Sequence, residues 1–325
     1  MNLRHKLYQM FILGTEGNGY KDALKNNLGG IIFFSKDIQS KNQFKNLIKE
    51  IKSQSLTMPF LSIDQEGGRV ERTENIHNGK KYLSAKFAFE KGDEFLEKQT
   101  EEISKELKSY GINLNFAPCI DVNTNPNNPI IGERSFSSNV EDVINAEKIV
   151  SQTYRKNGII PCAKHFPGHG DASADSHLTL PKINLTLEEM EKTHIKPFAL
   201  CADKIEMIMI AHLHCTCFDV VPTSLSKNAI SYLRNKIGFK GITISDDMIM
   251  KGVSSFGAQE ACEMGIRAGL NMFIYRNSNP ETIEIIENIA QKAENDNELK
   301  QNIENSFEKI INLKEKFFLL ENFHK

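Results

Sequence analysis

The segment IIPCAKHF, residues 159–166, stays apolar until it ends in Lys164 and His165. Continuous rather than alternating hydrophobicity is typical of strands that are buried on both faces of a parallel sheet. The preceding residues 141–158 have the pattern of an amphipathic helix, and Gly158 stands where a helix C-cap is expected. The segment therefore predicts a helix that leads into a buried strand with charged residues at its end.

Similar apolar runs recur along the chain, and polar segments with a helical pattern lie between most of them. The other runs are MFIL (10–13), GGIIFF (29–34), FLSID (60–64), LNFAPCIDV (114–122), IEMIMIAH (205–212), GITISDD (241–247) and LNMFIY (270–275). Buried strands that alternate with helices in this number predict an α/β fold, a parallel (β/α)8 TIM-type barrel. The first connection is short, so we expect an irregular first repeat. A doubly wound open sheet is the alternative, but the G-x-G-x-x-G loop after an early strand is missing.

Length and composition indicate an ordinary globular protein. We expect a single catalytic domain over residues 1–325, with the barrel at about 8–280 and a C-terminal helical segment at about 281–325. The formal net charge of −2 points to neither a nucleic-acid nor a membrane partner. The apolar stretch near the N-terminus is too short and broken for a signal peptide or a spanning helix. These features predict a cytoplasmic protein, by default a monomer.

Cysteine usage agrees with a reducing compartment. The chain has 6 cysteines and no C-x-x-C motif, and several of the cysteines lie within apolar runs. Free buried thiols are therefore the preferred interpretation. Cys215 and Cys217 flank Thr216, and a metal-binding role for this pair is the less favoured interpretation.

Charged residues follow the ends of most of the apolar runs. In a barrel of this type the active site lies at the C-terminal ends of the strands. Each residue also has a structural alternative: Asp64 and Asp246 could cap helices, and Lys164 and His165 could form an ion pair at a strand end. Convergence from so many strands is hard to explain as solvated surface, so we expect one polar site.

Four motifs resemble the family-three glycoside hydrolases, in their bacterial β-N-acetylhexosaminidase branch. They are SIDQEGGRVER, NPIIGERSF, KHFPGHGDASADSHLTLP and ITISDDMIMKG, and the resemblance runs in order from about residue 10 to about residue 275. The resemblance implies that Asp246 is the nucleophile and that His177, paired with Asp175, is the acid/base. It also implies that the sugar is bound by Asp64, Arg72, Arg134, Lys164 and His165.

These residue types suit the expected reaction, removal of a terminal N-acetylglucosamine from peptidoglycan fragments by an exo-acting, retaining enzyme. A carboxylate at a strand end can attack the anomeric carbon and form a glycosyl-aspartate. An imidazole titrates near pH ~6.5, so His177 can give and take a proton, and Asp175 can fix its tautomer. The neighbouring Asp247 should point to the other face of the strand. We expect the substrate to be a small saccharide or muropeptide, with no metal and no cofactor.

Three alternatives remain open at this point. A phosphorylase is one, because a histidine acid/base carries no negative charge that would repel phosphate. A metal-dependent hydrolase on the same barrel is another, with His165, His169, His177 and Asp246 as ligands. The third is a sugar-binding barrel without turnover.

Overall fold

Eight parallel strands close a barrel in the computed structural model, which describes residues 1–77, 80–172 and 180–317. The order around the barrel is β1-β10-β9-β7-β5-β4-β3-β2. The strands coincide with the apolar runs: β1 (Phe11–Glu16), β2 (Gly30–Phe33), β3 (Phe60–Ile63), β4 (Leu114–Asn115), β5 (Ile160–Phe166), β7 (Met207–Ile210), β9 (Ile242–Asp247) and β10 (Met272–Asn277). The predicted TIM-type barrel is confirmed.

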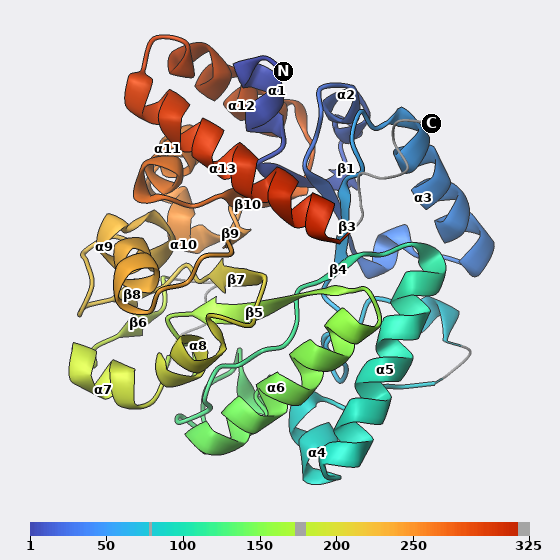
Figure 1. The fold of residues 1–325 in the computed structure, drawn as a ribbon, viewed down its shortest axis with the longest axis vertical. Helices are drawn as coiled ribbons and strands as arrows, with labels where there is room; N and C mark the ends of the chain where they lie inside the picture. The colour runs from blue at the N-terminus through green and yellow to red at the C-terminus, as the bar shows by residue number, and fades with distance from the viewer. Residues whose placement is uncertain (78–79, 173–179, 318–325) are drawn as a thin grey trace.

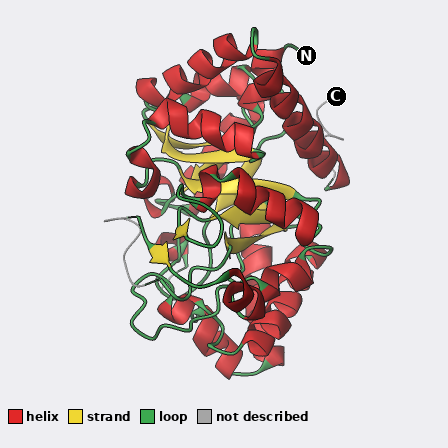
Figure 2. Cartoon of the chain, turned by 90° about the vertical axis from the view of Figure 1, so that its left-hand side faces the viewer, coloured by secondary structure: helices red, strands yellow, loops and turns green. Residues whose placement is uncertain are grey.

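Helices surround the strands (Figures 1 and 2). The first repeat is irregular, as expected, because its helix α2 (Tyr20–Lys25) has only 6 residues. The helix C-caps Gly111 and Gly269 are left-handed, with φ of 90° and 104°, a conformation that glycine adopts without strain. The remaining helices are α1 (Leu3–Tyr8), α3 (Lys41–Gln54), α4 (Ala85–Glu90), α5 (Asp93–Tyr110), α6 (Val140–Lys156), α7 (Leu187–Lys192), α8 (Lys196–Cys201), α9 (Lys227–Ser231), α10 (Lys251–Ser254), α11 (Ala258–Ala268), α12 (Pro280–Ala293) and α13 (Asn297–Lys316).

A second, two-stranded sheet was not predicted. It pairs β6 (Lys182–Ile183) with β8 (His214–Cys215) in parallel. Two-residue strands are too short to show a hydrophobic period. Ile183 and Cys215 are buried in a small apolar cluster of their own, separate from the main core. This sheet pairs the segment that follows residues 173–179 with the segment that follows β7.

The C-terminal helix α13 packs against α1 and α11 and carries a buried lysine (Figure 1). Lys314 Nζ donates to Gln9 Oε1 at 2.8 Å and to the Gly29 carbonyl at 3.0 Å, and it lies 4.8 Å from the centroid of the Phe60 ring. These groups stand at the N-terminal ends of the first three strands, opposite the end where charged residues follow the strands. Burial lowers the pKa of Lys314 to about 7.

Among the described residues, no helix is long and apolar enough to cross a bilayer.

Replacing Lys314 by methionine tests the cost of this burial. The unfolded chain keeps the lysine proton up to pH ~10.4, whereas the folded chain releases it near pH 7. Between these values the unfolded state binds more protons, so wild-type stability should rise with pH relative to Lys314→Met. In urea unfolding, the free energy of unfolding of the wild type relative to Lys314→Met should be higher at about pH 9.5 than at about pH 7, by on the order of 3 kcal/mol. Lys300→Met, at an exposed position on the same helix, is the control. A stability difference between wild type and Lys314→Met that is the same at both pH values would contradict the lowered pKa of Lys314.

Candidate active site

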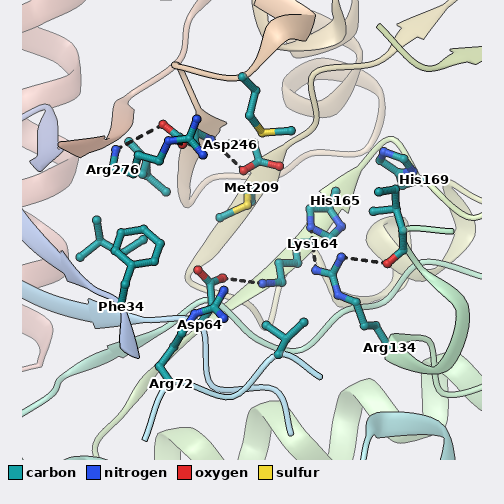
Figure 3. Close-up of a pocket in the computed structure, with 16 residues that line it drawn as sticks. Phe34, Asp64, Arg72, Arg134, Lys164, His165, His169, Met209, Asp246 and Arg276 are labelled. Carbon is teal, nitrogen blue, oxygen red and sulfur yellow. Dashed lines mark hydrogen bonds and ion pairs between the residues drawn. The ribbon is translucent and has the colours of Figure 1, made fainter. Parts of the chain in front are cut away.

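A cavity of about 300 Å³ lies among the C-terminal ends of the strands (Figure 3). All predicted site residues that the structure describes line it: Asp64, Arg72, Arg134, Lys164, His165 and Asp246. They come from β5, β9 and the segments after β3 and β4, so the fold brings together residues that are far apart in sequence. The other two predicted residues, Asp175 and His177, lie outside the described residues.

A buried carboxylate, Glu66, pairs with two cations that line the cavity, Lys164 and Arg134. Lys164 Nζ lies 2.7 Å from Asp64 Oδ1 and 2.5 Å from Glu66 Oε1. Arg134 donates from Nε and Nη2 to the two oxygens of Glu66, each at 2.9 Å. Burial alone would raise the pKa of Glu66, but Arg134 and Lys164 hold it well below its usual range. Burial would likewise lower the pKa of Lys164, but Asp64 and Glu66 raise it, so these groups stay charged.

A second buried carboxylate, Asp121, orients His165. Asp121 Oδ2 lies 2.7 Å from His165 Nδ1, and the carboxylate also accepts the backbone N–H groups of His165 and His169. On the other side of the ring, Nε2 faces Arg134 Nη2 at 3.3 Å. This arrangement places the imidazole proton on Nδ1 and makes Nε2 an acceptor. Burial would raise the pKa of Asp121, but the His165 ring and the backbone N–H of His169 keep it well below its usual range.

The two adjacent aspartates at the end of β9 differ in their surroundings. Asp246 Oδ1 accepts the N–H of Asp247 at 2.7 Å. Burial would raise the pKa of Asp246, but His165, His212, that N–H group and Lys164 together lower it, so the carboxylate is ionised. Asp247 instead accepts the N–H of Ile249, and Arg276 Nε lies 3.2 Å from its Oδ2. Burial raises the pKa of Asp247 to about 6.

The expectation that Asp247 lies on the far face of its strand is wrong. Both aspartates line the cavity. Strict alternation fails because the register between β9 and β10 shifts beside Asp247. Such irregularities re-aim side chains near active sites.

Several residues in and around the cavity were missed or given another role by sequence reasoning. Glu66 and Asp121 stood in the predicted motifs and strand ends, but a sequence does not show which charges pair. His169 was expected to shape its loop or to bind a metal. It lines the cavity at 4% exposure, and burial lowers its pKa to about 4, so its ring is neutral. Neither ring nitrogen has a hydrogen-bond partner in the described part of the chain.

The donor set does not fit the proposed metal ligands. Both nitrogens of His165 already face protein partners, Asp121 and Arg134. Within the described ranges, the one cluster compact enough to hold an ion is Cys119, Asp121 and His165. There the Asp121 carboxylate accepts two backbone N–H groups and the Cys119 thiol. These contacts argue against His165 as a metal ligand, and His177, another of the proposed ligands, lies outside the described residues.

The chain matches known proteins over most of its length. The family model for the glycosyl hydrolase family 3 N-terminal domain matches residues 2–313. The β-hexosaminidase of Tolumonas auensis is 33% identical over 279 residues, which cover 82% of this chain and 82% of that protein. The β-hexosaminidase A of Pseudoalteromonas piscicida is 34% identical over 254 residues, or 71% of this chain and 42% of that longer protein.

A solved structure agrees with the sequence matches. The family 3 β-N-acetylglucosaminidase from Paenibacillus sp. superimposes with a TM-score of 0.92 at 26% identity. The match covers 98% of this chain and 63% of that chain. The chain thus spans less than two thirds of the Paenibacillus chain and less than half of the Pseudoalteromonas protein.

Glu66→Gln tests the buried ion pairs. The change keeps the shape of the side chain but leaves Lys164 and Arg134 without their shared counterion. Breaking a buried pair in this way should lower the free energy of unfolding by about 3–5 kcal/mol, measured by chemical denaturation. Glu188→Gln is the matched control, because Glu188 and its partner Lys192 are 76% and 70% exposed. Equal effects of the two changes would contradict a stabilising role for Glu66.

Proposed function

Because the chain belongs to glycosyl hydrolase family 3, as its motifs predicted, we propose that it is an exo-acting, retaining β-N-acetylglucosaminidase. One observation carries the proposal: an ionised aspartate, Asp246, lines the same small cavity as a set of fixed charged groups that can bind hydroxyl groups. The cavity volume of about 300 Å³ lies at the lower end of the range for small-molecule sites, which supports a pocket for one terminal sugar.

Asp246 is the proposed nucleophile. In a retaining mechanism this carboxylate attacks the anomeric carbon, the glycosidic bond breaks, and a glycosyl ester forms that water later hydrolyses. The reaction needs an ionised carboxylate, and the low pKa of Asp246 supports this role. Among the described residues, its hydrogen-bond partner is the N–H of Asp247, and it is not held in an ion pair as Asp64 is.

His177 is the proposed acid/base, with Asp175 as the residue that orients it. The family resemblance supports these roles. So does the position of the chain on either side, since His169 lines the cavity shortly before residues 173–179 and β6 follows them. An imidazole titrates near neutral pH, so it can protonate the leaving oxygen and then take a proton from the attacking water.

Substrate recognition is assigned to Asp64, Arg72, Arg134, Lys164 and His165. Paired charges of this kind form strong hydrogen bonds to hydroxyl groups, and their partners fix them before the sugar arrives. Arg72 lies over the Phe34 ring at 5.9 Å and lines the cavity, and its buried Nε has no hydrogen-bond partner among the described residues. Met209 and Met250 add apolar lining beside Asp246, which suits an acetamide methyl group.

We assign peptidoglycan fragments as the natural substrate and the cytoplasm as the location, with a monomer as the working state. All six cysteines are free thiols, which supports a reducing compartment. Phosphorolysis is the competing reaction, since a histidine acid/base does not repel phosphate.

A product assay tests the function. The protein should release single N-acetylglucosamine units from the non-reducing ends of muropeptide-type disaccharides, and faster than from chitooligosaccharides. NMR of the first product should show the β-anomer. The sugar should be free in phosphate buffer as well as without phosphate. Internal fragments, an α-anomer or a sugar phosphate would each refute the corresponding part of the proposal.

The acid/base role predicts a dependence on the leaving group. His177→Ala should slow hydrolysis of the disaccharide by roughly 10²–10⁴-fold, but that of an activated aryl glycoside far less, because only the disaccharide needs protonation. Asp175→Asn should have the same effect in weaker form. Steady-state kcat/KM on both substrates is the measurement, with wild type as reference. Equal losses on both would argue against this role.

A further inference from the structure

Two thiols, Cys215 and Cys217, lie in contact where β8 ends. Their sulfurs are 3.4 Å apart. The chain turns here, because Phe218 and Asp219 both donate their N–H groups to the carbonyl of Cys215, at 3.0 and 3.3 Å. The interpretation of both as buried thiols is only half right: Cys215 is buried, whereas Cys217 is partly exposed. The other four cysteines are all buried.

We propose that Cys215 and Cys217 are a modification site that closes to a disulfide by exchange with a low-molecular-weight disulfide such as oxidised glutathione. Cys217 is the accessible member, so its thiolate attacks one sulfur of the small disulfide and releases the first small thiol. The Cys215 sulfur then attacks Cys217 Sγ, and its proton leaves with the second small thiol. Two protein thiols are thereby oxidised, and one small disulfide is reduced to two thiols.

The order of attack follows from the contact between the sulfurs. The hydrogen bond from Cys215 lowers the pKa of Cys217, and the same hydrogen bond, with burial, raises the pKa of Cys215. The exposed sulfur is therefore the better thiolate, and the buried one is placed to resolve the mixed disulfide.

Closing the disulfide must disturb the small sheet. The sulfurs have to move from 3.4 Å to about 2.05 Å, and the ring that forms contains the backbone of Thr216. Thr216 donates its N–H to the carbonyl of Ile183 at 3.1 Å, and its hydroxyl group donates to the same oxygen at 3.3 Å. These bonds connect β8 to β6, so oxidation acts on the connection between the two strands.

The same sheet connects the site to catalysis. His214 donates its N–H to the carbonyl of Pro181 at 2.9 Å, and Ile183 pairs with Cys215. β6 therefore depends on β8, and β6 follows residues 173–179 in the chain. This step rests on the proposed function, in which His177 in that segment is the acid/base. Oxidation should then slow hydrolysis of the disaccharide, whose leaving group needs protonation, more than hydrolysis of an activated aryl glycoside, whose leaving group does not.

Peptide mapping tests the modification itself. After treatment of native protein with oxidised glutathione, alkylation and trypsin, the peptide of residues 205–227 should carry no alkyl group and be lighter by two hydrogens. Cys215→Ala should instead hold glutathione on Cys217, and Cys217→Ser should hold neither modification. Cys262→Ser, which removes a buried thiol on α11, should still close the disulfide. Alkylation of both thiols in oxidant-treated wild type would overturn the inference.

Kinetics test the connection to catalysis. Oxidised wild type should lose about 10-fold or more in kcat/KM on the disaccharide, since a misplacement of about 1 Å can cost ~10²-fold. The loss should be smaller on an activated aryl glycoside and reversed by dithiothreitol, and Cys217→Ser should not respond to the oxidant. An unchanged disaccharide rate in protein with a mapped disulfide would overturn this connection. Failure of the reduced protein to hydrolyse any N-acetylglucosaminide would refute the proposed function instead, while the peptide map would still decide the thiol site.

Discussion

The carboxylate of Glu66 is the constraint on which the site depends. Lys164 and Arg134 are both largely withdrawn from water, and unpaired charges in such a place cost far more than the fold can supply. Glu66 follows β3, Arg134 follows β4 and Lys164 lies on β5, so one side chain ties together the ends of three neighbouring strands. The cations are thereby aimed at the cavity before any ligand is present, which is the preorganisation that carbohydrate binding and catalysis require.

Asp121 extends this constraint to the loop that leads to the proposed acid/base. It holds the ring of His165, and it accepts the backbone N–H of His169 at 2.6 Å. Arg134 then connects His165 to Glu66. The groups proposed to hold the sugar and the root of the segment that contains His177 thus belong to one hydrogen-bonded network. A substitution in one part of this network should therefore shift the groups in the other part.

The sequence allowed the barrel to be predicted because strands buried on both faces have continuous apolar runs, as in IIPCAKHF. The six described site residues could be assigned because their motifs resemble a family and because parallel strands all end at one rim. Other features depend on contacts that a linear pattern does not contain. The β6–β8 pair is too short to show a period, the role of Glu66 depends on partners distant in sequence, and the placement of Asp247 depends on a register shift between β9 and β10.

The two aspartates on β9 show how local environment can distinguish identical residues. Neighbouring carboxylates are difficult to ionise together, and here their pKa values are pushed apart. Burial dominates at Asp247 despite Arg276, and its oxygens are held by that cation and by the backbone N–H groups of Ile249 and Arg276. Asp246 faces His165, His212 and Lys164, which favour its anion. Arg276 thus holds the carboxylate of Asp247, and Asp246 is left as the ionised carboxylate to which the proposed mechanism assigns the role of nucleophile.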